Sequence, residues 1–255
     1  LRIAGEFLPN ASDPGATFTA ITQIGTEIAV LIYFRKDLAR IGRSFLGSIF
    51  ARKKINQLSD PTSFQEAKLG WFIILGSLPI LIVGFLGQEY IRTTLRSLWL
   101  VAFALIVFGL ILGYLDAKRP HERKLKDLTL IHAALFGIAQ AVALIPGVSR
   151  SGATIAMGRF LKYDRTSALR YSFLLAIPAV LASGFNELIE AVENPGGSFS
   201  LFETAAATVS SFIVGYVVIA WLMRFISTRS FAPFVIYRVI LGTAILGFLS
   251  AGLID

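Results

Sequence analysis

One arginine lies inside a stretch of the chain that is otherwise suited to lipid. From Leu128 to Thr154 there are 27 residues, and Arg150 is the only one with a formal charge. A guanidinium at bilayer depth costs on the order of 3 kcal/mol even on a lenient insertion scale, so such a residue faces a partner or a water-filled cavity. We therefore expect a membrane fold that brings Arg150 to something anionic.

The composition of the whole chain agrees with a membrane fold. Of the 255 residues, 55% are hydrophobic and 16% are charged, and the mean hydropathy is +0.70, which is too apolar for a soluble domain of this size. The absence of cysteine excludes disulfides, zinc–thiolate sites and cysteine nucleophiles. Because the net charge of +8 sits in loops between apolar segments, we interpret it as a topology signal and not as a nucleic-acid surface.

Six apolar runs are long enough to cross a hydrocarbon core of about 30 Å. They cover residues 16–34, 70–87, 98–115, 171–189, 205–223 and 234–253. A seventh run, 128–146, stops at Pro146-Gly147 and is followed by a short run rich in small residues, 151–161. These two pieces predict a re-entrant helix pair. The predicted fold is an all-α polytopic membrane protein with six transmembrane helices plus this pair.

The distribution of lysine and arginine favours re-entry, because cytoplasmic loops carry the excess of these residues. Nineteen of the 24 basic residues fall on one side only if the unit 128–161 enters and leaves by the same face, and the opposite side then holds three. Arg150 and Arg238 remain within the membrane. We expect Arg238 to snorkel to the cytoplasmic end of its helix.

With this topology the chain is one integral membrane domain, 1–255, made of two repeats of opposite orientation, 1–115 and 128–255. Inverted repeats are known among membrane transporters, where broken helices meet near the midplane. Because a re-entrant pair precedes the three spans of the second repeat, symmetry predicts another pair in the first repeat. Most of that pair would lie upstream of Leu1.

The turn between the two short helices is suited to an anion. Pro146 ends the first helix, Gly147 and Gly152 let the backbone approach a ligand closely, and the amides that begin the next helix point toward the turn. A helix N-terminus beside Arg150 is typical of a phosphate or carboxylate site, and the guanidinium can hold two phosphate oxygens in a planar fork. The hydroxyls that add donors are those of Ser149, Ser151 and Thr154.

A purely structural interpretation of the turn stays open. Its hydroxyls would then bond to nearby carbonyls, and Arg150 would snorkel or pair with a distant acid. Glu27, an acidic residue within the membrane, is either a catalytic or metal-binding carboxylate or a structural counter-ion. Gln23 and Gln140 are expected to form helix–helix hydrogen bonds, and we keep Gln23 and Glu27 as supporting residues of the site.

The chain resembles the undecaprenyl-diphosphate phosphatases of bacteria, also called bacitracin-resistance phosphatases. The resemblance covers nearly the whole chain and is carried first by the turn PGVSRSGAT (146–154). The other matching segments are GIAQAVALI (137–145), FLLAIPA (173–179), TAITQIGTEIAVLIYFRKD (19–37), GWFIILGSLPILIVG (70–84) and PFVIYRVILG (233–242).

This resemblance implies a multi-pass enzyme of the bacterial plasma (inner) membrane. It would hydrolyse undecaprenyl diphosphate to undecaprenyl phosphate and inorganic phosphate, and so recycle the carrier lipid for cell-wall synthesis. The active site would lie in a cavity open toward the outer face, and a divalent cation (magnesium or calcium) with unknown ligands would support activity. The implied catalytic residues are Arg150 and Ser149, and the implied substrate-binding residues are Gly147, Ser151, Gly152 and Thr154.

The attacking group would be a hydroxyl, such as that of Ser149, or an activated water. The family's second motif, a glutamate-rich stretch ending in Ser-Ser-Thr-Gly-His, would directly precede Leu1, so we expect the 255 residues alone to be weakly active or inactive. The alternative functions are a transporter or flippase of an anionic lipid or solute, and a non-catalytic lipid-binding protein. The expected partners are the polyprenyl diphosphate lipid and the bilayer, without nucleic acid, and a homo-oligomer stays open.

Overall fold

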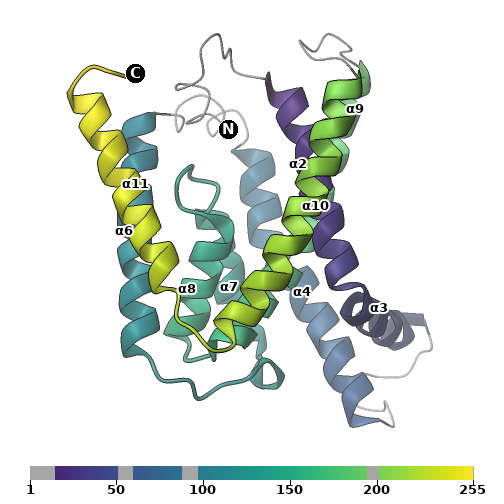
Figure 1. Cartoon of the computed structure of the whole chain (residues 1–255). Coiled ribbons are helices and arrows are strands. Elements are labelled where there is room, and N and C mark those ends of the chain that lie inside the picture. The colour runs from purple at the N-terminus through teal and green to yellow at the C-terminus, as the bar shows by residue number, and fades with distance from the viewer. Residues whose placement is uncertain (1–14, 51–59, 88–96, 194–200, 255) are drawn as a thin grey trace. The chain divides into compact units, whose positions relative to one another are not determined.

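The described part of the backbone consists mainly of helices joined by loops and turns. The computed structural model describes residues 15–50, 60–87, 97–193 and 201–254. These residues form no β-strand, only an isolated bridge between Arg123 and Tyr163, so the predicted all-α class is confirmed. The helices are α2 (Gly15–Tyr33), α3 (Arg35–Phe50), α4 (Pro61–Leu86), α6 (Leu98–Lys118), the 3-10 turn η3 (Leu125–Asp127), α7 (Leu130–Val142), α8 (Arg150–Phe160), α9 (Arg165–Glu193), α10 (Leu201–Ile226) and α11 (Ala232–Ser250) (Figure 1).

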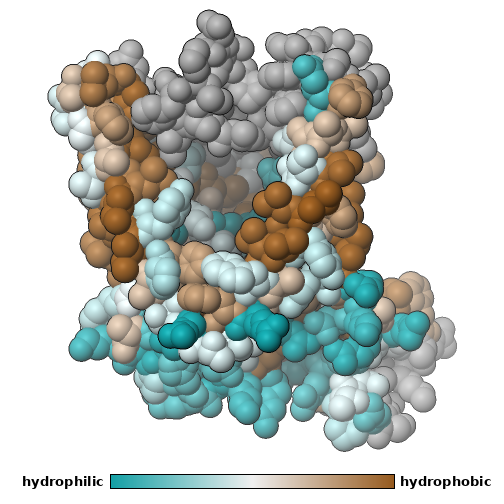
Figure 2. Space-filling view, viewed as in Figure 1, coloured by the Kyte–Doolittle hydropathy of each residue, from teal (hydrophilic) through white to brown (hydrophobic). Residues whose placement is uncertain are grey.

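Four of the described helices are long and apolar enough to cross a membrane, namely α4, α6, α10 and α11. They confirm the predicted runs 70–87, 98–115, 205–223 and 234–253. Large apolar side chains face outward from them, such as Phe103, which is 62% exposed, and Ile240, which is 64% exposed. Figure 2 shows this apolar surface over α11, at the left of the view. Because soluble proteins rarely expose apolar surfaces of this extent, the protein is a membrane protein.

The other two predicted spans, 16–34 and 171–189, coincide with α2 and α9. Within the described residues, these two helices are not among the four identified as membrane spans. The count of six spans therefore stays a prediction.

The chain divides into two compact units. These units do not follow the repeat boundaries predicted from the sequence, and the repeats stay a prediction. Unit 1 comprises Leu1–Arg35 with Ile177–Leu222, and unit 2 comprises Lys36–Ala176 with Met223–Asp255. In unit 1, α2 packs closely on α10, because a Cβ added at Gly25 would lie 2.2 Å from the carbonyl oxygen of Thr208.

Unit 2 contains two short helices, α7 and α8, which pack on each other and are joined by residues 143–149 (Figure 1). Helix α7 has 13 residues and α8 has 11. At a rise of 1.5 Å per residue they are about 20 Å and about 17 Å long, so neither can cross a core of about 30 Å alone.

Glycines allow neighbouring helices to pack closely around α7 and α8. A Cβ added at Gly137 of α7 would lie 2.3 Å from the carbonyl oxygen of Gly76 in α4. In the same way, a Cβ at Gly242 of α11 would lie 2.8 Å from the carbonyl oxygen of Ala102 in α6. Helices α4 and α7, and helices α6 and α11, therefore meet with their backbones nearly in contact.

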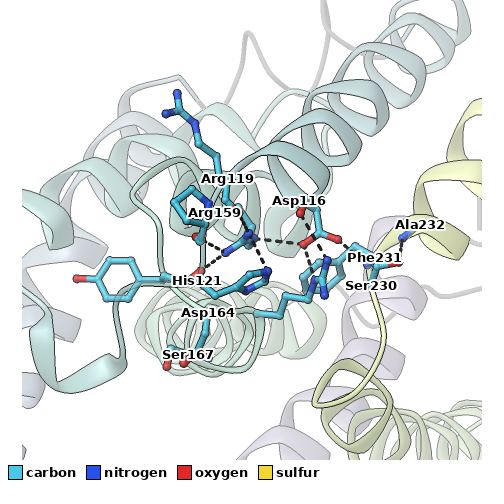
Figure 3. Close-up of polar contacts among 12 residues, drawn as sticks. Asp116, Arg119, His121, Arg159, Asp164, Ser167, Ser230, Phe231 and Ala232 are labelled. Carbon is cyan, nitrogen blue, oxygen red and sulfur yellow. Dashed lines mark hydrogen bonds and ion pairs between the residues drawn. The ribbon is translucent and has the colours of Figure 1, made fainter.

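A buried ion-pair cluster holds the far end of α8. Asp116, at the end of α6, is 4% exposed and Arg159 is fully buried. The Asp116 Oδ1 atom lies 3.2 Å from Arg159 Nε and 2.7 Å from Arg165 Nε, and its Oδ2 accepts a 3.0 Å hydrogen bond from the backbone N–H of Phe231 (Figure 3). Arg159 also donates to the carbonyls of Arg119, Pro120 and Tyr163.

Arg159 is one of the 19 basic residues that the predicted topology places on one side of the membrane, and its guanidinium is fully buried. Its charge is buried because Asp116 of α6 and the carbonyls of Arg119, Pro120 and Tyr163 supply the acceptors. The Asp116 carboxylate also pairs with Arg165 of α9 and accepts from Phe231, just before α11. The cluster thus joins four separate parts of unit 2 at one end of α8.

Candidate functional site

The turn after α7 is built by backbone geometry that its sequence specifies. The last turn of α7 tightens, with Ala143 N–H donating to Gln140 O at 3.1 Å, and Pro146 then follows. Gly147 has a φ of +92°, a conformation that favours glycine. A Cβ at Gly147 would lie 2.4 Å from the carbonyl oxygen of Val101 in α6. The close approach at Gly147 is therefore to α6, and its contact with a ligand stays a prediction.

Ser149 begins α8 from a strained backbone conformation. Its φ of 68° and ψ of 116° are unusual for a residue with a Cβ, and such outliers cost on the order of 1–3 kcal/mol and are most common at functional sites. The side chain is exposed, and its Oγ accepts a 3.2 Å hydrogen bond from the N–H of Gly152. A hydroxyl that accepts in this way can still donate its proton to a ligand.

The residue before Ser149 anchors this conformation. Val148 is fully buried and forms a small hydrophobic core with Ala104 of α6 and Ala153 of α8. Because Val148 points into the protein, Ser149 on its far side is held at the surface of the turn.

Arg150 is the first residue of α8 and is half-buried. The first turn of α8 contains no acidic residue. The guanidinium and the positive end of the helix dipole lie side by side, so an anion bound there would be stabilised by both. The arrangement supports the predicted anion site.

A second arginine supports the turn, and the sequence analysis missed it. Arg238 of α11 is only 7% exposed, so the prediction that it snorkels is wrong. Its Nη2 donates to the carbonyl oxygens of Gly147 at 2.9 Å and Val148 at 2.8 Å. A Cβ added at Gly152 would lie 2.5 Å from Arg238 Nη1, so a larger residue there would displace this guanidinium from its present position.

The signal for Arg238 was present in the sequence. Like Arg150, it is a charge in the middle of an apolar run, and such residues usually bind a partner inside the protein. Nothing local identified that partner, because the turn lies 90 residues earlier in the chain.

The hydroxyl of Thr154 already has partners within the protein. Thr154 is fully buried, and its Oγ1 donates toward the carbonyls of Arg150 at 2.9 Å and Ser151 at 3.2 Å. It also contacts the hydroxyl of Ser172 in α9. Hydrogen bonds to nearby carbonyls are what the purely structural interpretation of the turn expects for its hydroxyls. Ser151 is half-buried. Contact of either residue with a substrate stays a prediction.

Gln23 and Glu27 lie together on α2, in unit 1. Gln23 Nε2 donates to Glu27 Oε1 at 3.1 Å, so this bond is within one helix. Glu27 is 8% exposed, and a Cβ added at Gly184 of α9 would lie 2.8 Å from its Oε2. Their supporting role at the turn, which belongs to unit 2, stays a prediction.

Gln140 differs from expectation. It is fully buried on α7, and neither atom of its side-chain amide has a hydrogen-bond partner among the described residues. The expected helix–helix hydrogen bond of Gln140 is therefore not formed within that part of the chain.

The described residues show whether the protein's own side chains could form a metal site. No group of three or more histidine, aspartate or glutamate side chains in that part of the chain could hold one. The residues around the turn do not themselves supply a ligand set, and the role of a divalent cation stays a prediction.

Comparison with known proteins gives one consistent family. The family model "Bacitracin resistance protein BacA" matches residues 1–244. The undecaprenyl-diphosphatase of Paenarthrobacter aurescens is 53% identical over 247 residues, which is 96% of this chain and 87% of the relative. The undecaprenyl-diphosphatases of Pseudarthrobacter chlorophenolicus and Micrococcus luteus are 54% and 50% identical over 257 residues, which is 100% of this chain and 90% of each relative.

Proposed function

The chain belongs to the bacitracin resistance protein BacA family, and we infer that it hydrolyses undecaprenyl diphosphate to undecaprenyl phosphate and inorganic phosphate. The observation that carries this inference is its identity of about 50% to proteins named undecaprenyl-diphosphatase over nearly their full lengths. The protein is thus a membrane phosphatase that recycles the carrier lipid for cell-wall synthesis. Its lipid substrate and the bilayer are its partners.

The finer topology is part of the same proposal. Helices α7 and α8 enter and leave by one face as a re-entrant pair, and six further helices cross the membrane, in inverted repeats 1–115 and 128–255. The lengths of α7 and α8 support re-entry, as does the one-sided distribution of 19 basic residues among 24. The protein lies in the bacterial plasma membrane with its active site open to the outer face.

The turn provides the chemistry for binding and cleaving a diphosphate. Arg150 holds phosphoryl oxygens in a bidentate fork, and the amides at the start of α8 and the hydroxyls of Ser149 and Ser151 donate to the others. These donors stabilise the negative charge that develops as the bridging P–O bond breaks and a new P–O bond forms. The new bond comes from water directly, or from Ser149 Oγ with water then releasing the phosphate. Gln23 and Glu27 assist, and a divalent cation would neutralise further charge.

Arg238 positions this turn without touching the substrate. Arg238→Lys retains the charge but loses the planar fork that spans two carbonyls. We expect kcat to fall about 10- to 100-fold, because small displacements of catalytic groups have effects of that size, while KM changes little. Steady-state phosphate release by the full-length protein would measure both constants.

The matched control for Arg238 is Arg229→Lys, at an exposed arginine in the loop before α11. It should leave kcat unchanged. An Arg238→Lys protein that folds normally and keeps its full kcat would contradict the positioning role.

Hydrolysis itself is tested with full-length protein in vesicles that contain undecaprenyl diphosphate. We expect release of one inorganic phosphate per lipid consumed, and conversion of the lipid to its monophosphate. Movement of the diphosphate lipid between leaflets without phosphate release would instead favour the flippase alternative. Binding without either process would favour a non-catalytic lipid-binding protein.

A further inference from the structure

Unit 2 contains a cavity away from the turn, at the end where α4 begins beside η3. Its volume is about 390 Å³, which is within the range of about 300–1,000 Å³ typical of small-ligand sites. The lining comes from the first three turns of α4 and from residues 125–128. None of the residues of the 146–154 turn contributes to it.

The lining combines an apolar wall with two lysines. The apolar residues are Phe64, Leu69, Phe72, Leu125 and Leu128. Lys68 is half-buried, and its Nζ lies 5.4 Å from the centroid of the Phe72 ring, so its ammonium is held against the apolar wall. Lys126, which is exposed, approaches from η3. Neither lysine makes a salt bridge within the described residues.

The acid that lines the cavity is already paired. Glu66 Oε1 lies 3.4 Å from Arg40 Nε of α3, and Glu66 Oε2 accepts a 3.1 Å hydrogen bond from Ser44. Because α3 balances the Glu66 carboxylate, the remaining charge of the lining is that of the two lysines. The cavity is therefore complementary to an anion attached to an apolar chain.

Helix α3 places this end of unit 2 at a membrane surface. One face packs on α4, with Ile41 buried and Phe45 against Trp71 at a ring-centroid distance of 5.0 Å. A second face exposes apolar side chains, and a third is basic. The exposed apolar residues are Leu46, Ile49 and Phe50, and the exposed basic residues are Lys36, Arg40 and Arg43.

An amphipathic helix with this division of faces lies in the interface between lipid and water. Figure 2 shows hydrophilic side chains gathered at the same lower end of the view. A ligand at the adjoining cavity would thus be within the headgroup region of one leaflet.

We propose that this cavity binds an anionic phospholipid of the bilayer, with its phosphate at Lys68 and Lys126 and its acyl chains along Phe64, Leu69 and Phe72. A zwitterionic lipid is disfavoured, because its cationic group would be repelled by the lysines. The site lies outside the hydrolytic turn, so its occupancy does not depend on hydrolysis.

The test is binding of a fluorescent phosphatidylglycerol analogue to the purified protein in detergent, followed by anisotropy. Unlabelled phosphatidylglycerol should displace the probe at about tenfold lower concentration than phosphatidylcholine. The double variant Lys68→Gln/Lys126→Gln should bind the probe roughly 25-fold more weakly, since each lysine near an anionic headgroup contributes a factor of about five. Lys68→Arg/Lys126→Arg, which keeps both charges, should bind it nearly as well as the parent.

The matched control is Lys118→Gln/Arg229→Gln, which removes the same charge from exposed positions that neither line the cavity nor adjoin its lining segments in sequence. It should leave the affinity within about twofold, because distant exposed charges are screened. The proposal is overturned if phosphatidylcholine competes equally, or if the control weakens binding as much as the cavity variant. It is also overturned if undecaprenyl phosphate displaces the probe far better than phosphatidylglycerol does, because the cavity would then serve the enzyme's own lipid.

Discussion

Replacing Arg150 with alanine in the full-length protein is expected to lower kcat/KM for undecaprenyl diphosphate by at least about 1,000-fold. A guanidinium that pairs with two phosphoryl oxygens at low dielectric stabilises developing charge far more than one exposed to water, and losing single donors of this kind costs about 100- to 1,000-fold. Arg150 is only half-buried at the start of α8, so folding should be nearly unaffected. Phosphate release and thermal unfolding, measured on the same preparation, separate the two effects.

Two further variants sharpen this test of Arg150. Arg150→Lys keeps a charge but not the planar fork, so its activity should lie between those of the parent and the alanine variant. Arg229→Ala removes an exposed arginine elsewhere in unit 2 and should have no effect. Normal turnover by a folded Arg150→Ala protein would remove Arg150 from the mechanism.

The largest expected effect on stability comes from Asp116→Ala. This change leaves the fully buried Arg159 without its carboxylate and the N–H of Phe231 without its acceptor. Removing one partner of a buried ion pair costs about 3–5 kcal/mol. The full cost applies here because the remaining carbonyl acceptors of Arg159 do not neutralise its charge. We expect the free energy of unfolding in detergent micelles to fall by that amount.

The exposed ion pair of Lys162 and Glu122 provides the comparison for Asp116. Its atoms are 3.1 Å apart, but the side chains are 41% and 56% exposed. Glu122→Ala should therefore change the free energy of unfolding by less than about 1 kcal/mol. If the two variants unfold alike, the Asp116 cluster does not hold the end of α8.

Much of the fold could be predicted from local pattern. The runs 70–87, 98–115, 205–223 and 234–253 were confirmed as apolar helices because length and hydropathy alone decide whether a segment can span a bilayer. The break between α7 and α8 was equally local, since proline disfavours helix at Pro146 and Gly147 adopts a positive φ, although α7 itself ends earlier, at Val142. Runs 16–34 and 171–189 are helical as predicted, and their crossing of the bilayer stays a prediction.

The amino-acid sequence by itself determined the family, the membrane class and the turn with Arg150 at the start of a helix. Each of these depends on residue types that are neighbours along the chain. Only the tertiary structure decided which polar groups on different helices pair with one another. Arg238 donates to the turn, Arg159 is buried against Asp116, and Thr154 bonds to its own helix and to Ser172. The reason is physical: a buried charge must find partners, and packing of distant helices determines which partners it meets.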